Sequence, residues 1–284
     1  MIDDMGRCLP RSTKGHMLRR VITSVGLLVV GVPAILLGGI PYFLLISLFL
    51  GVAAWEYGML FRAAQFHPPR PLLVIGVVAT VATRAFFPNY SISVFTIFML
   101  IAMTQHLIDY ERGQDNAGID FTISVTGLAY LGWIGAYLVD LRFVQNGAWW
   151  LMLILPTVWL VDTGAYSIGV AYGKHFMTPR LSPKKTWEGF WAGAISGMLC
   201  STFFSYAYSV WGPLHVTLWQ GALFGLAVGM LSPLGDLGES MLKRQAGIKD
   251  SGNLFPGHGG ALDRIDSWLW AAVLGYYFVT WFAH

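Results

Sequence analysis

Apolar runs long enough to cross a membrane dominate this sequence. A membrane-spanning helix needs about 17–25 predominantly apolar residues. Runs of about this length lie at residues 21–39, 42–61, 72–87, 92–108, 121–139, 149–170, 190–211, 216–234 and 267–282. Pro and Gly mark several of the connections between them. So much apolar sequence cannot be buried in a water-soluble core. It predicts an all-α, polytopic integral membrane protein with about nine transmembrane helices.

The composition agrees with a membrane protein. Charged residues make up 12% of the chain, whereas an average soluble protein has about 25%. The 12 Trp and 33 Gly are typical of interfacial belts and of close helix packing. Cys8 and Cys200 lie far apart and fit no disulfide or metal spacing. The sequence pI of about 8.8 would also suit a nucleic-acid-binding protein. Because the basic residues follow the membrane topology instead, no nucleic-acid partner is predicted.

The positions of the basic residues predict the orientation. Of the 18 Lys and Arg residues, all but Arg84 and Arg142 fall in the N-terminal tail or in alternate loops. The positive-inside rule assigns those segments to the cytosol. Nine spans then give a cytosolic N-terminus and an external C-terminus. The first run follows a basic tail, as in a signal peptide, but no small-residue cleavage site is evident, so we expect a retained helix.

This topology divides the chain into three parts. We expect a cytosolic tail at residues 1–20 and an N-terminal transmembrane region at 21–147. A C-terminal transmembrane region at 148–284 carries two cytosolic polar loops, at 171–189 and 235–266. No soluble second domain is predicted.

The longest polar run, residues 240–266, has the residue types of an anion site. It contains Ser240, Lys243, Arg244, Lys249, Gly257, His258, Gly259, Gly260, Asp263, Arg264 and Asp266. Glycines let backbone amides approach an anion closely. A helix that begins near Ala261 would direct its positive end at the same position.

Closely spaced carboxylates flank the Gly-rich turn. Asp236, Ser240 and Lys243 fall on one helix face, and Asp263 and Asp266, three residues apart, share another. Two such faces joined by a turn can converge on one cation. A charged, solvated loop is the ordinary alternative. The density of Gly, Asp and basic residues favours a site for a polyphosphate and its metal ion.

Other polar residues lie close to or inside the apolar runs. Asp162 lies within the sixth run, and ionisable residues at such depth are costly and usually functional. Glu56 lies near the cytosolic end of the second run and is equally consistent with an interfacial residue. Lys184 and Lys185 lie in a loop just before the seventh run. They could bind phosphate, although positive-inside topology alone would also supply lysines there.

Three motifs resemble one enzyme family. They are Ser240-x-x-Lys243-Arg244 with Lys249-Asp250, His258-Gly259-Gly260 and Asp263-Arg264-x-Asp266; Asp162-Thr163-Gly164-Ala165-Tyr166-x-x-Gly169; and Ser182-Pro183-Lys184-Lys185-Thr186-x-Glu188-Gly189. Together they closely resemble the phosphatidate cytidylyltransferases (CDP-diacylglycerol synthases), most strongly from Val161 onward. The resemblance implies a nucleotidyltransferase that converts CTP and phosphatidate to CDP-diacylglycerol and pyrophosphate in phospholipid synthesis. It also implies a bacterial inner membrane or an organelle membrane, with the active site facing the cytosol.

For such an enzyme we expect Mg²⁺ between Asp236 and Asp263, with Asp162 and Asp266 completing the site and a second cation nearby. The expected phosphate-binding residues are Lys243, Arg244, Lys249 and Arg264 with the turn Gly257, His258, Gly259 and Gly260, and secondarily Ser182, Lys184, Lys185 and Ser240.

The sequence leaves several alternatives open. The acceptor could be another lipid or isoprenoid phosphate, or the enzyme an isoprenoid-alcohol kinase. A transporter is less favoured, because polarity is concentrated in the C-terminal half. A monomer and a homodimer are both compatible with the sequence.

Overall fold

The chain is almost entirely helical. A computed structural model describes residues 13–252 and 259–282, and their side chains from residue 25 onward. The α-helices are α1 Thr13–Leu37, α2 Gly39–Ala63, α3 Arg70–Phe86, α4 Ser91–Glu111, α5 Ala117–Gly127, α6 Tyr137–Phe143, α7 Gly147–Tyr172, α8 Trp187–Trp211, α9 Leu218–Leu231, α10 Pro233–Gln245 and α11 Leu262–Phe282. Two short strands, β1 Phe176–Thr178 and β2 Ser182–Thr186, separate α7 from α8.

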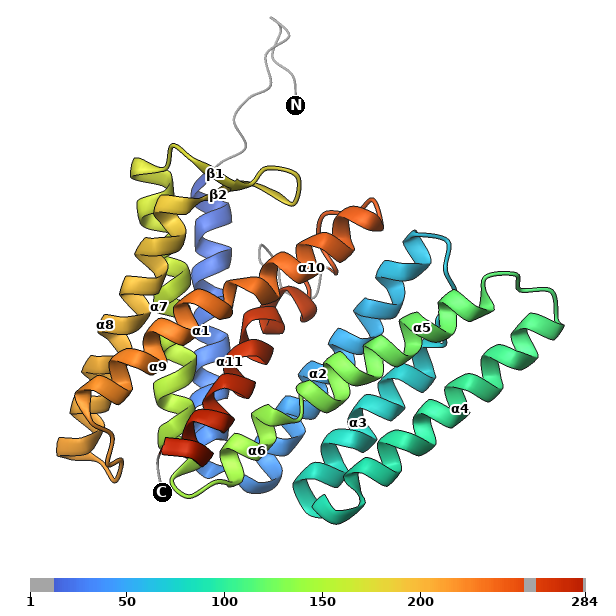
Figure 1. Cartoon of the computed structure of the whole chain (residues 1–284), viewed down its shortest axis with the longest axis horizontal. Coiled ribbons are helices and arrows are strands. Elements are labelled where there is room, and N and C mark those ends of the chain that lie inside the picture. Colours follow the sequence, from blue (N-terminus) through green and yellow to red (C-terminus); the bar gives the residue numbers. More distant parts are fainter. Residues whose placement is uncertain (1–12, 253–258, 283–284) are drawn as a thin grey trace, which may run out of the picture.

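Three groups of helices lie next to one another (Figure 1). In this view α1, α7, α8 and α9 occupy one side and α3, α4 and α5 the other, with α2, α6 and α11 between them. Glycines allow α8 and α9 to pack closely. A side chain at Gly225 of α9 would overlap the backbone carbonyl of Gly197 in α8. Small residues at such contacts are typical of helix packing in membranes, where close backbone approach replaces the hydrophobic effect.

Five helical stretches in the described part of the chain are long and apolar enough to cross a membrane. They are Gly39–Ala63, Pro88–Glu111, Ala117–Phe143, Gly147–Tyr172 and Leu218–Gln245. The structure is therefore that of a mostly helical protein of the multi-pass membrane type. Helices α3, α8 and α11 coincide with predicted spans but are not among these five. Helix α1 begins at Thr13, within the segment predicted as a tail. The total of nine spans and their orientation stay predictions.

The predicted span at 121–139 is not one regular helix. Helix α5 passes into a π-helical segment, Leu128–Ile134, and then into α6. The wider π turn occurs where the chain packs tightly on its neighbours. A side chain at Gly127 would come within 2.8 Å of the Tyr57 ring, and the Tyr57 hydroxyl donates to the carbonyl of Ile123 at 3.0 Å. Leu128 and Leu131 are fully buried. This irregular stretch belongs to the core that joins α2 and α3.

A β-hairpin stands where the sequence predicted only a loop. Strands β1 and β2 pair antiparallel, with Phe176 opposite Thr186 and Thr178 opposite Ser182. Thr186 ends the hairpin and caps α8, since its Oγ1 accepts a hydrogen bond from the Gly189 amide at 3.2 Å. The strand carries Lys184 and Lys185, so the hairpin fixes the backbone direction of both lysines.

Candidate active site

The N-terminal turns of helices α10 and α11 pack closely against each other. Helix α10 follows α9 with only Ser232 between them. Gly235, in the first turn of α10, lies against the backbone carbonyl of Asp266, and any side chain there would overlap that carbonyl. The absence of a Cβ therefore permits the contact. It brings the carboxylates of Asp236 and Asp266 together.

Three carboxylates form a cluster at this contact. Oxygen atoms of Asp236, Glu239 and Asp266 all lie within 4.8 Å of one another. Glu239 and Asp266 are buried, and Asp236 is partly exposed. The Oε1 atom of Glu239 is buried without a hydrogen-bond partner in the described structure. Hard divalent cations take carboxylate oxygens as ligands, so a metal ion at this point would satisfy an oxygen that the protein leaves unpaired. The residues present therefore fit Mg²⁺.

Asp263 lies outside this cluster and is held by the protein itself. Its carboxylate accepts hydrogen bonds from Lys243 Nζ at 2.5 Å, the Ser251 hydroxyl at 2.8 Å and the Gly260 amide at 2.8 Å. Burial of this carboxyl, which precedes the apolar part of α11, disfavours its charge. The hydrogen bonds from Lys243 and Gly260 outweigh that effect and lower the pKa of Asp263 to about 2. The ionised Asp263 thus fastens α10 and the Gly turn to the start of α11.

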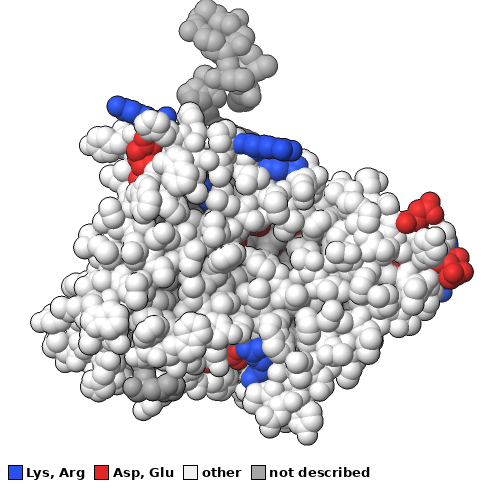
Figure 2. Space-filling model, viewed as in Figure 1, with Lys and Arg blue, Asp and Glu red and all other residues white. Residues whose placement is uncertain are grey.

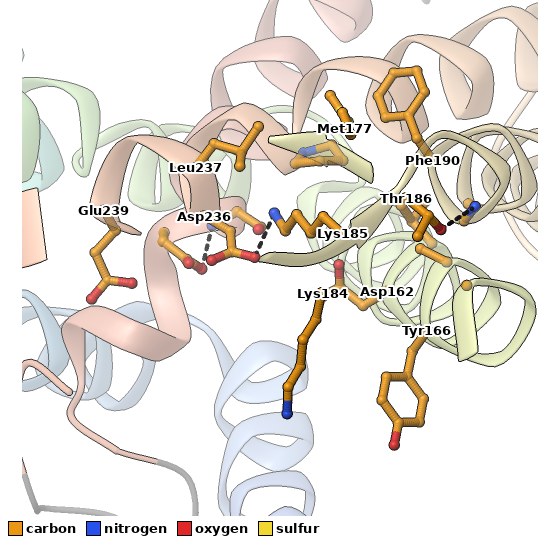
Figure 3. Close-up of a pocket in the computed structure, with 18 of the residues that line it drawn as sticks. Asp162, Tyr166, Met177, Lys184, Lys185, Thr186, Phe190, Asp236, Leu237 and Glu239 are labelled. Carbon is orange, nitrogen blue, oxygen red and sulfur yellow. Dashed lines mark hydrogen bonds and ion pairs between the residues drawn. The ribbon is translucent and has the colours of Figure 1, made fainter. Parts of the chain in front are cut away.

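Acidic and basic side chains share one cavity of about 420 Å³. Figure 2 shows a hollow near the middle of one face, with acidic side chains visible inside it and basic ones above it. Lys185 Nζ of β2 contacts Asp236 Oδ2 at 2.7 Å. In Figure 3, Lys185 reaches toward Asp236, whereas Lys184 extends its amine away from that ion pair. The hairpin and α10 therefore form two walls of the same cavity.

Most of the predicted charged residues meet in this cavity. Its lining includes Asp162, Lys184, Lys185, Asp236, Lys243, Asp263, Arg264 and Asp266. Asp162 is exposed into the cavity from α7. The Nε atom of Arg264 is buried without a hydrogen-bond partner among the described residues. Acidic and basic side chains are thus concentrated where α7, β2, α10 and α11 meet.

Other predicted residues that the structure describes are not part of the cavity lining. The Ser240 hydroxyl donates to Asp236 at 3.4 Å, and the Arg244 Nε donates to the carbonyl of Leu181 at 3.3 Å, which braces the hairpin. Ser182 begins β2 and Lys249 is exposed after α10. Gly259, with φ of 83°, and Gly260 form the turn against Asp263. The predicted residues Gly257 and His258 lie outside the described residues.

Sequence reasoning missed Glu239 as a site residue and left the role of Glu56 undecided. Glu239 lies three residues after Asp236, so helical spacing could have identified it. Glu56 of α2 is buried, and its Oε2 accepts from the Leu262 amide at 2.9 Å and the Ser251 hydroxyl at 3.3 Å. Side chains at Gly252 or Gly260 would overlap its carboxylate. Glu56 therefore supports the start of α11, and no local signal connects it with a segment so distant in the sequence.

The sequence is similar to those of known proteins. Residues 18–282 match the profile of the cytidylyltransferase family. The chain belongs to that family. A phosphatidate cytidylyltransferase of Staphylococcus saprophyticus is 31% identical, over 90% of this chain and 96% of the relative. One from a Synechocystis species is 32% identical, over 92% and 96%. One from Mycobacterium bovis is 34% identical, over 77% and 73%. The family match spans every element that lines the cavity.

Proposed function

We propose that this cytidylyltransferase acts on phosphatidate and CTP, forming CDP-diacylglycerol and pyrophosphate for phospholipid synthesis. The observation that carries the proposal is the cavity in which the Asp236, Glu239 and Asp266 carboxylates lie beside Lys184, Lys185, Lys243 and Arg264. Apolar helices α7, α8 and α11 supply part of its lining, so a lipid head can meet a nucleotide there. The names of the relatives support phosphatidate as the acceptor.

The chemistry requires charge neutralisation more than acid–base catalysis. A phosphate oxygen of phosphatidate attacks the α-phosphorus of CTP. A new P–O–P bond forms, and the bond from the α-phosphorus to the oxygen that bridges it to the β-phosphorus breaks, so pyrophosphate leaves. The attacking oxygen is already anionic at neutral pH, so no strong general base is needed. The barrier lies in bringing two anions into line, which fixed cations lower.

The basic side chains are suited to different parts of this task. Lys185 is 2.7 Å from Asp236, beside the carboxylate cluster, so we assign it to a phosphate that contacts the metal. The unpaired, buried Nε of Arg264 provides a directed hydrogen bond for a second phosphate. Lys184 lines the same cavity with its amine directed away from the Lys185–Asp236 ion pair, and offers a positive charge to the lipid phosphate or the nucleotide.

The carboxylates are suited to holding the metal. Asp236, Glu239 and Asp266 are the proposed Mg²⁺ ligands, with Asp162 as a candidate for a second cation in the same cavity. When bound, Mg²⁺ would neutralise charge on the triphosphate and on the leaving pyrophosphate. The earlier expectation that Asp263 is also a ligand stays a proposal. Lys243 Nζ contacts both Asp263, at 2.5 Å, and Glu239 Oε2, at 3.0 Å. Coordination by Asp263 requires its contacts to Lys243 or to Ser251 and Gly260 to open, whereas Glu239 keeps its Oε1 unpaired among the described residues.

We further propose that the hairpin and the end of α10 face the cytosol, where CTP is available. The charge pattern supports this orientation, together with a cytosolic N-terminus and nine spans. Figure 2 agrees with a molecule embedded in a bilayer, since much of the face below the hairpin carries no charged side chain. The lipid head would then enter the cavity from the membrane and the nucleotide from the cytosol.

Pyrophosphate release from CTP by the purified full-length protein tests the proposal. The assay uses Mg²⁺ and a panel of phosphatidate, an isoprenoid phosphate and an isoprenoid alcohol in detergent micelles. We expect release that depends on phosphatidate. Release with the isoprenoid phosphate alone would favour the other acceptor. Lipid phosphorylation without pyrophosphate would indicate a kinase, and the absence of any turnover would contradict the proposed function.

A further inference from the structure

A second cavity, of about 240 Å³, lies between α1, α2, α7 and α11. Its lining includes Gly31, Ile46, Met152, Trp159, Ile265 and Trp268, and none of the side chains that the structure describes around it is charged. The lining also includes Tyr42, whose hydroxyl donates to the carbonyl of Leu138 at 2.8 Å and is therefore already satisfied. The cavity offers apolar contact and suits a hydrocarbon group.

This apolar cavity adjoins the polar one through shared helices. On α11, Arg264 and Asp266 line the polar cavity, whereas Ile265, between them, and Trp268 line the apolar one. On α7, Trp159 lines the apolar cavity and Asp162, one turn later, lines the polar one. The rings of Trp159 and Trp268 lie 6.2 Å apart between centroids. This Trp pair therefore lies at the boundary of the two cavities.

The two cavities also lie at different depths. Helix α7 runs toward the hairpin end of the molecule and α11 runs away from it (Figure 1). Trp159 precedes Asp162 on α7, and Trp268 follows Asp266 on α11. Helix α7 thus assigns the apolar cavity to the side of the polar cavity that is farther from the hairpin. On α11, Trp268 extends the apolar lining in the same direction, while Ile265 lies level with the polar residues. A lipid whose phosphate entered the polar cavity would direct its chains toward the apolar one.

We propose that this cavity binds one acyl chain of the phosphatidate substrate. The inference rests on the proposed function, because it takes the polar cavity as the site of the lipid phosphate. A bilayer is as apolar as the cavity, so moving the chain between them contributes little affinity. The bound chain instead orients the lipid. A chain held in the apolar cavity, on the side of the Trp pair away from the hairpin, fixes the direction from which the lipid phosphate approaches CTP.

Filling the cavity tests this assignment. Gly31 of α1 lines the cavity and has open space around the position of a Cβ, so Gly31→Leu adds apolar volume there. Gly118 of α5 has equally open surroundings but lies away from both cavities, so Gly118→Leu is the matched control. The full-length variants are assayed for pyrophosphate release with long-chain phosphatidate in mixed micelles and with a short-chain phosphatidate whose tails do not fill the cavity.

We expect Gly31→Leu to lower kcat/KM for the long-chain lipid about tenfold or more, with little change for the short-chain lipid. Gly118→Leu should leave both unchanged. Full long-chain activity in Gly31→Leu, or an equal loss with both lipids, would overturn the assignment. If the wild-type protein releases no pyrophosphate with either phosphatidate, the proposed function itself fails, so the two failures are distinguishable.

Photo-crosslinking keeps the proposal testable if Gly31→Leu does not fold. A phosphatidate with a photoreactive group near the end of one chain is added to the wild-type protein. Labelled residues are then mapped by mass spectrometry. We expect labelling of α1 near Gly31 or of α11 near Trp268, displaced by unlabelled phosphatidate but not by phosphatidylcholine with the same chains. Equal displacement by both lipids, or labelling elsewhere, would contradict a substrate site.

Discussion

The Oε2 atom of Glu56 in α2 accepts a hydrogen bond of 2.9 Å from the amide of Leu262, the first residue of α11. The same oxygen accepts from the Ser251 hydroxyl, which also donates to Asp263. A carboxylate in the N-terminal region therefore holds the helix that carries Asp263, Arg264 and Asp266. A buried carboxylate with such partners is costly to disturb, because its loss leaves buried amide and hydroxyl donors unpaired.

Glu56→Gln should lower kcat about tenfold or more while the protein stays folded in detergent, because a shift of the start of α11 misaligns Arg264 and Asp266. An amide keeps the size of the side chain but replaces one acceptor oxygen with a donor. Glu111→Gln, at the exposed end of α4, is the matched control. Steady-state kinetics and thermal unfolding check the prediction. Near-wild-type kcat in folded Glu56→Gln would show that this contact does not position the site.

The carboxylate cluster predicts how the Mg²⁺ requirement changes. Glu239→Gln and Asp266→Asn each remove a proposed ligand and should raise the Mg²⁺ concentration for half-maximal rate about tenfold or more, since even the loss of a residue that only supports a ligand costs that much. Asp115→Asn, in the turn before α5, should change nothing. Rates are measured over a Mg²⁺ titration at saturating CTP. An increased requirement in Asp263→Asn, with none in the cluster variants, would assign the metal to Asp263 instead.

The Lys185–Asp236 ion pair predicts a defect in the use of substrate. Lys185→Ala removes a phosphate partner but no metal ligand, so kcat/KM for CTP or phosphatidate should fall about tenfold or more. Lys185→Arg should rescue poorly, because the fork of Arg does not replace a compact charge beside Asp236. Lys174→Ala, on the exposed chain before the hairpin, is the control. Unchanged kinetic constants in Lys185→Ala would contradict a role in substrate binding. The lysine would then contribute only to membrane topology through the positive-inside rule.

Cysteine accessibility tests the predicted orientation. Single cysteines are introduced at Arg180, in the hairpin turn, and at Trp281, near the end of α11, after Cys8 and Cys200 have been replaced by Ser. Both chosen side chains are exposed. A membrane-impermeant thiol reagent should label the two positions from opposite sides of sealed vesicles. Labelling of both from one side would contradict the nine-span topology.

Spacing along the sequence anticipated which residues of the candidate site would lie together. Asp236, Lys243 and Asp266 could be assigned to helix faces by spacing alone, and these faces do converge on one cavity. An even number of predicted spans between the Lys185 loop and α10 returned both segments to the same side, and Lys185 does contact Asp236. Residue spacing on a helix and the number of spans between two loops can both be determined from the sequence alone.

Other features depend on packing and had no such signal. The contact of Glu56 with Leu262 joins residues 206 positions apart. The π-helical segment Leu128–Ile134 adjoins tight contacts at Gly127, and hydropathy shows only a continuous apolar run there. The β-hairpin depends on register between two short polar segments, which periodicity cannot detect. Glu239 is different, because its spacing from Asp236 was visible but its burial was not.

Tracing the phosphorus atoms of CTP tests the central claim most directly. The purified protein is incubated with Mg²⁺, phosphatidate and CTP labelled at either the α- or the γ-phosphorus. A phosphatidate cytidylyltransferase transfers the α label to the lipid and releases the γ label as pyrophosphate, in equal amounts. We expect that distribution, with no product when phosphatidate is omitted. Transfer of the γ label to the lipid, or retention of both labels in CTP, would contradict the proposed reaction.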